Sequence, residues 1–111
     1  MSFEQTAERV RFDPARMQKI NLFETPHLFC DLYCLEPGQA QKPHTHEEAT
    51  KFYYVIEGRG TFLAGAEERE LGPGGLVCAR PGEIHGVDNR SASRLVLLVA
   101  MGPNPNPPRS G

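Results

Sequence analysis

The chain has 111 residues, the size of one ordinary domain and too short to divide into two separate cores. Hydrophobic residues make up 39%, charged residues 23%, and the formal net charge is −2, a balance typical of a folded globular protein. The twelve basic residues are scattered along the chain. Nucleic-acid binding needs a clustered Lys/Arg surface, so we do not expect a nucleic-acid partner.

The beginning of the chain does not have the features of a targeting segment. It carries charges at Glu4 and Glu8 and has no apolar h-region. No run approaches the ~20 apolar residues that a membrane span requires. Three cysteines, Cys30, Cys34 and Cys78, lack CxxC spacing, which fits reduced thiols. We therefore expect a cytoplasmic protein without a membrane partner.

Helical character is confined to Thr6–Val10, which is too short to form a stable helix alone, and we assign residues 1–18 to an N-terminal arm. The rest of the chain is divided by eleven glycines and ten prolines. Short segments with the residue types of strands follow one another every 8–12 residues or so, as in a sandwich or closed barrel. These segments are residues 19–25, 27–35, 51–58, 60–65, 68–72, 75–79, 84–89 and 93–101. The pattern predicts an all-β barrel domain over residues 19–101 and a proline-rich flexible tail over residues 102–111.

The pair His44-Thr45-His46 is the most informative feature of the sequence. Side chains two apart on a strand point to the same face, so the two imidazoles can approach one point. Such a short pattern also arises by chance. A third histidine, His85, follows further along the chain, whereas His27 has no partner at this spacing and is expected on the surface.

The spacing around these histidines repeats a known arrangement. The first segment reads Gly38, five residues, His44-Thr45-His46, four residues, Lys51, six residues, Gly58. The second reads Gly74, five residues, Arg80-Pro81-Gly82, two residues, His85, three residues, Asn89. Together they resemble the two signature motifs of the cupin superfamily. The resemblance covers roughly Pro37 to Asn89 and implies a double-stranded β-helix, or jelly-roll, cupin barrel.

The sequence departs from the cupin motifs at two places. Arg80 stands where the second motif has proline, and Pro81 follows one place later. More important, the first motif usually has a glutamate three or four residues after His46, and this chain has Thr50 and Lys51 there.

Three interpretations of the missing carboxylate remain open. The first is a three-histidine site that holds a divalent transition metal and leaves positions for water or substrate. In the second, Glu47 or Glu48 turns in from the loop and supplies the carboxylate. In the third, the site has lost its metal and Lys51 places an ammonium there. Imidazole ligands do not decide the metal, which could be Fe, Mn, Zn, Ni or Cu.

Other residues near the motifs add to the predicted site. Alternation places Tyr53 on the same face as Lys51. Either residue could orient an anionic substrate or assist proton transfer. Lys42 would share the face of His44 if a strand begins that early, although Pro43 makes its start uncertain.

The resemblance implies a metal-dependent enzyme that acts on a small polar molecule. Because three-histidine cupins include dioxygenases of diketones and thiols, it implies dioxygenase-like chemistry. The alternative is a non-catalytic module that binds a small ligand or senses it. Small cupins commonly associate sheet to sheet, so we expect a homodimer. The apolar run Leu95 to Met101 could form part of its interface.

Overall fold

The computed structural model describes residues 1–104, so most of the expected tail, residues 105–111, lies outside the described range. The chain begins with a single-turn helix, α1 (Thr6–Arg9), and continues as β-strands. The strands are β1 (Gln18–Glu24), β2 (Phe29–Leu35), β3 (Ala40–His44), β4 (Thr50–Glu57), β5 (Gly60–Ala64), β6 (Glu67–Leu71), β7 (Leu76–Ala79), β8 (His85–Asp88) and β9 (Leu95–Gly102). In the described part of the chain, no helix is long and apolar enough to cross a membrane.

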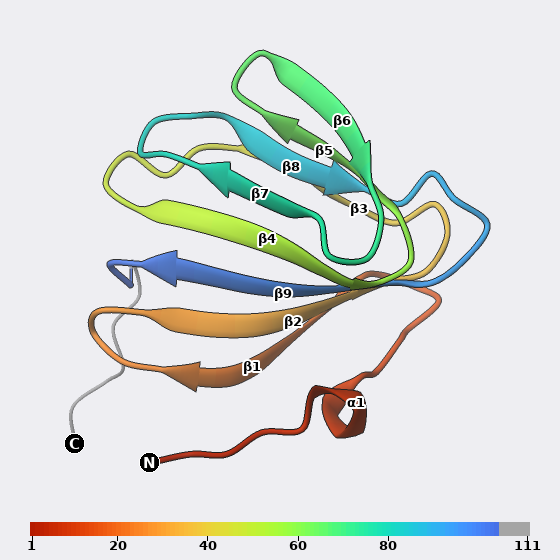
Figure 1. Cartoon of the computed structure of the whole chain (residues 1–111), viewed down its shortest axis with the longest axis horizontal. Helices are drawn as coiled ribbons and strands as arrows, with labels where there is room; N and C mark the ends of the chain where they lie inside the picture. Colours follow the sequence, from red (N-terminus) through yellow and green to blue (C-terminus); the bar gives the residue numbers. More distant parts are fainter. Residues whose placement is uncertain (105–111) are drawn as a thin grey trace.

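The strands form two antiparallel sheets that face one another (Figure 1). The five-stranded sheet has the order β1-β2-β9-β4-β7, and the four-stranded sheet has the order β3-β8-β5-β6. The last strand, β9, lies between β2 and β4, so the two halves of the chain are joined within one sheet. This arrangement confirms the predicted all-β jelly roll.

The main core lies between the two sheets. It contains alternate residues of β9, Leu95, Leu97 and Val99, packed with side chains such as Tyr53 and Phe62. Burying one side chain of this size contributes about 1.5–3 kcal/mol. The core therefore holds the two sheets at a fixed distance around the site described below.

A second cluster covers the opposite face of the five-stranded sheet. Val10 and Phe12 of the N-terminal segment pack there against a group that includes Cys34 and Val96. The segment runs beside β1 in Figure 1. Most of the apolar run of β9 is thus buried by its own chain, while Leu98 on the outer face stays partly exposed. The homodimer itself stays a prediction.

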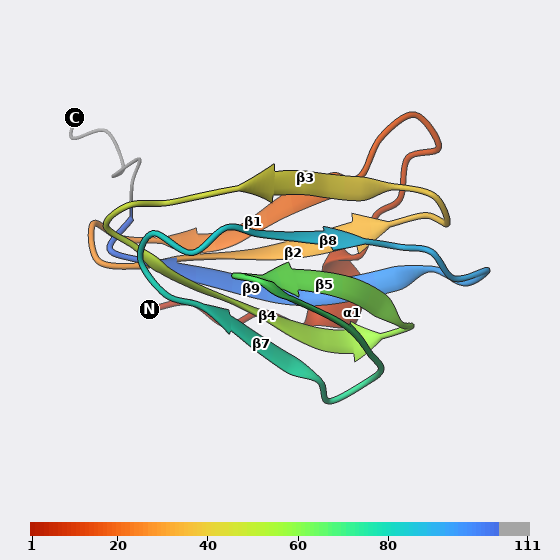
Figure 2. The same ribbon diagram turned by 90° about the horizontal axis from the view of Figure 1, so that it is seen from above.

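Strand β3 was not among the strand segments predicted from the sequence, although the interpretation of the histidine pair assumed a strand at His44. Ala40–His44 has no apolar alternation and contains Pro43, which lacks the N–H needed in a central strand. The structure places β3 at the edge of its sheet, beside β8, where a proline is tolerated (Figure 2).

The pairing of β3 with β8 has an irregularity between Gln41 and His44. Such a bulge inserts a residue and changes which side chains share a face. Gln41 therefore turns toward the interior, while Lys42 is exposed. The expectation that Lys42 shares the face of His44 is wrong for this reason.

The first residues of the expected tail pack against the body of the protein. Gly102 ends β9, and Asn104 is buried beside the turn between β1 and β2. The Asn104 side chain donates hydrogen bonds to the carbonyl oxygen of Thr25, at 3.0 Å, and to the Glu24 carboxylate. Asn104 and Glu24 also line the cavity beside the candidate site.

Gly58→Ala should destabilise the fold more than Gly38→Ala. Both glycines have positive φ, +85° and +87°, so alanine costs about 1–2 kcal/mol at either position. A Cβ at Gly58 would also overlap the backbone carbonyl of Arg94, whereas a Cβ at Gly38 meets no atom within 4 Å. Urea unfolding of the two variants measures the difference. Equal losses of unfolding free energy would show that the contact with Arg94 is unimportant.

Candidate metal centre

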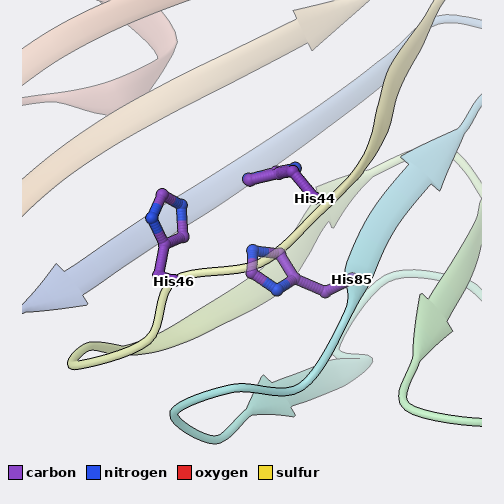
Figure 3. A group of neighbouring side chains, drawn as sticks. All are labelled: His44, His46 and His85. Atoms are coloured by element: carbon purple, nitrogen blue, oxygen red, sulfur yellow. The ribbon is translucent and has the colours of Figure 1, made fainter.

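Three histidines converge at the end of the barrel where β3 and β8 meet. His44 is the last residue of β3, His85 is the first residue of β8, and the two are paired opposite one another. The sequence predicted that His44 and His46 converge because they alternate along one strand. Instead, His46 lies in the loop after β3, so strand alternation does not bring the two rings together. Figure 3 shows the three rings turned toward one another. One nitrogen of each ring lies within 4.8 Å of one nitrogen of the others, so the three side chains form a group that could hold one metal ion.

The backbone fixes the orientation of two of the rings. Nδ1 of His44 lies 2.9 Å from the Lys42 carbonyl oxygen, and Nδ1 of His85 lies 3.0 Å from that of Glu83. A carbonyl oxygen can only accept, so each Nδ1 carries the hydrogen and each Nε2 keeps a lone pair. Metal-binding histidines are commonly oriented in this way.

The Nε2 atom of His85 is buried and has no hydrogen-bond partner among the described residues. Buried polar atoms are nearly always paired, so an unpaired lone pair calls for a missing partner. Two further imidazoles lie beside it. The donor set and its orientation fit a divalent transition metal.

The three imidazoles are held in the form that binds metals. Burial lowers the pKa of His44, His46 and His85, and it lowers the pKa of His85 to about 4. The positive charge of Lys51 acts in the same direction. All three rings are therefore neutral at pH 7, and protons compete weakly with a metal ion.

Lys51 occupies the place where related motifs carry a glutamate. Its side chain is only 2% exposed, whereas Thr50 is exposed. Its Nζ lies 3.2 Å from Oε1 of Gln41 and 3.5 Å from Nε2 of His44. Burial, and then the charge of Lys19, lower the pKa of Lys51 to about 7. The lysine therefore faces the histidines directly and is only partly protonated at neutral pH.

Gln41 connects Lys51 to two buried tyrosines. Its Oε1 accepts hydrogen bonds from Lys51 and, at 2.6 Å, from the hydroxyl of Tyr53. Its Nε2 donates to the hydroxyl of Tyr33 at 3.1 Å. Tyr53 shares the face of Lys51 as predicted, but its hydroxyl is bound to Gln41, and burial raises its pKa. Tyr53 thus positions Gln41, while direct contact with a substrate stays a prediction.

A cavity of about 380 Å³ opens beside the histidines. This volume is at the small end of the range for ligand pockets. Its wall includes His44, His46 and Lys51, and Lys19 and Asp31 also line it. Sequence reasoning missed both of these residues. Asp31 could have been noticed, because it is the one charged side chain in the apolar run Phe29–Leu35.

The two glutamates of the loop do not complete the site. Glu47 and Glu48 are exposed, and neither joins the group formed by the three histidines. The structure thus gives no support to the interpretation in which one of them replaces the missing carboxylate.

Lys51→Met should make the stability of the metal-free protein less dependent on pH. The pKa of Lys51 is about 7 in the folded protein, against an ordinary 10.5. Between these values the unfolded chain binds more protons, so the free energy of unfolding rises with pH across that window. Methionine does not titrate, so the variant should lack this rise and should be more stable than the wild type below pH 7.

Urea unfolding at about pH 6, 8 and 10 measures this effect. Lys42→Met is the matched control, because Lys42 is exposed and outside the cavity. A Lys51→Met protein with the same pH profile as the wild type would contradict the burial of a titrating amine at this position.

Comparisons with known proteins agree with this fold. Residues 31–101 match the model of the cupin domain family. The TT1209 protein from Thermus thermophilus is 43% identical, with a TM-score of 0.92, over 95% of this chain and 100% of that one.

Two more distant structures also align. KdgF from a Halomonas species is 23% identical (TM-score 0.83; 96% of both chains). An RmlC-like cupin from Desulfovibrio desulfuricans is 26% identical (TM-score 0.82; 93% of this chain and 97% of that one). No curated protein matches the sequence. Because residues 31–101 match the cupin domain and the histidines of both motifs lie together, the chain belongs to the cupin superfamily.

Proposed function

We propose that this cupin binds one divalent transition metal through His44, His46 and His85 and acts as a metal-dependent, dioxygenase-like enzyme on a small polar molecule. The observation that carries the proposal is the buried, unpaired Nε2 of His85, which converges with nitrogens of the other two histidines. The candidate metals are Fe, Mn, Zn, Ni and Cu, all of which accept nitrogen ligands.

A metal held by three neutral imidazoles keeps its full charge and supplies a Lewis acid with open coordination positions. The chain supplies the surroundings. Gln41 fixes the Lys51 amine beside His44, at the edge of the cavity. With a pKa of about 7, Nζ of Lys51 can hold or release a proton near neutral pH, which suits a group that moves protons.

Lys51 also competes with the metal. In its protonated form, it can donate a hydrogen bond to the same Nε2 lone pair of His44 that a metal needs. Because burial favours the neutral amine, Lys51 would compete only weakly with a metal for His44 at neutral pH. This is why we prefer the metal site to the interpretation in which Lys51 has replaced the metal.

His44→Ala and His85→Ala should each lose most of the bound metal, because two imidazoles remain where three are needed. His27→Ala is the matched control, since His27 is exposed in the turn between β1 and β2. Elemental analysis of proteins purified without added metal, and again after dialysis against one metal at a time, measures the content. Unchanged metal in both site variants would refute the proposed centre.

The enzymatic part of the proposal requires turnover. We expect the Fe(II)-loaded protein to consume oxygen with a member of a panel of diketones, thiols and catechols, and His85→Ala to be inactive on that compound. The measurement is oxygen uptake with an electrode. Tight binding of one compound without oxygen uptake for any of them would favour the alternative, a ligand-binding or sensory module.

A further inference from the structure

Two lysines reach the cavity beside the metal centre from different strands. Lys19 belongs to β1 and is paired with Tyr33 of β2, while Lys51 belongs to β4. The Nζ atoms lie 5.4 Å and 5.3 Å from the centre of the same Tyr33 ring. The two positive charges thus flank one aromatic wall of the cavity, and they come from elements far apart in the sequence.

Neither lysine is neutralised by a direct partner. Within residues 1–104, the ion pairs join arginines to carboxylates and include neither Lys19 nor Lys51. The carboxylates that line the cavity, Asp31 and Glu24, instead accept hydrogen bonds from the side-chain amides of Asn21 and Asn104. Both cations are therefore available to a ligand.

The formal charges of the lining side chains cancel, because two lysines stand against two carboxylates. The three histidines are neutral and Lys51 is only partly protonated at neutral pH, so a bound divalent metal would leave an excess of between one and two positive charges at this small cavity. Unbalanced charge at a partly buried site is costly, and a ligand of opposite charge removes the cost. The cavity is therefore built to accept an anion once the metal is present.

We propose that the ligand of this cavity is a small organic carboxylate held jointly by the metal and by Lys51 and Lys19. The inference rests on the proposed metal centre and names the class of its substrate. Asp31 faces the same cavity and is only 8% exposed, so its carboxylate opposes the anion and limits the negative charge that the cavity accepts. No arginine, the usual bidentate partner of phosphate, is among the described lining residues. These features favour a carboxylate over a phosphate.

The test uses the full chain loaded with Co²⁺, whose visible absorption responds to its ligands. Malonate, its neutral analogue malonamide and inorganic phosphate are titrated separately, followed by absorption and calorimetry. Malonate should bind at least about tenfold more tightly than malonamide, the difference expected for charge-assisted hydrogen bonds. It should also bind more tightly than phosphate.

The variants identify the groups responsible. Lys51→Met should weaken malonate binding about tenfold, and Lys19→Met should weaken it by a smaller factor because Lys19 is more exposed. Asp31→Asn should strengthen malonate binding, because it removes a negative charge that repels the anion. Lys42→Met, which replaces the remaining lysine of the chain, should leave malonate binding unchanged. Malonamide binding should not respond to the lysine variants.

The outcomes separate this inference from the proposed function. Cobalt content is measured first, and a wild-type protein that retains no cobalt refutes the metal centre and the inference with it. If cobalt is retained, two results overturn the carboxylate inference alone. One is equal affinity for malonate and malonamide, and the other is a malonate affinity that neither Lys51→Met nor Lys19→Met changes. Tighter binding of phosphate than of malonate also overturns it. Because Lys19 is exposed, Lys19→Met gives a readable result even if Lys51→Met folds poorly.

Discussion

The antiparallel pairing of β3 with β8 is the constraint on which the site depends. It places His44 opposite His85, although the two residues are far apart in the sequence. The backbone carbonyls of Lys42 and Glu83 then fix both rings with Nε2 facing inward. The opposing five-stranded sheet completes the centre by bringing Lys51 against His44. The backbone geometry of the fold thus holds the three histidines in an arrangement that could bind a metal ion.

Lys51 gives the centre its particular electrostatic character. A glutamate in this place would neutralise part of the charge of a metal, whereas an amine adds to it or stays neutral. The cost of burying the amine is reduced by Gln41, which accepts its hydrogen bond, and by the rings of Tyr33 and Tyr53 nearby. With the proposed metal bound, this balance of charge would favour an anionic ligand over a neutral one.

The sequence predicted the parts that depend on local pattern. Alternation in residues 51–57 correctly placed Lys51 and Tyr53 together, and motif spacing correctly joined His85 to His44 and His46. Strand β3 was missed because an edge strand with Pro43 carries no apolar alternation. The bulge in β3 then put Gln41, rather than Lys42, inside. Lys19 and Asp31 reach the cavity only through the long-range packing of β1 and β2, which no short motif encodes.

The central claim is that the three histidines hold a metal while Lys51 stands beside it without binding. A crystal structure of the metal-loaded protein, with anomalous data collected on both sides of the absorption edge of the metal, tests it directly. We expect one anomalous peak about 2.0–2.1 Å from a nitrogen of each histidine, with Nζ of Lys51 outside bonding distance. Absence of a peak there, with Lys51 hydrogen-bonded to His44 in a protein exposed to metal, would contradict it.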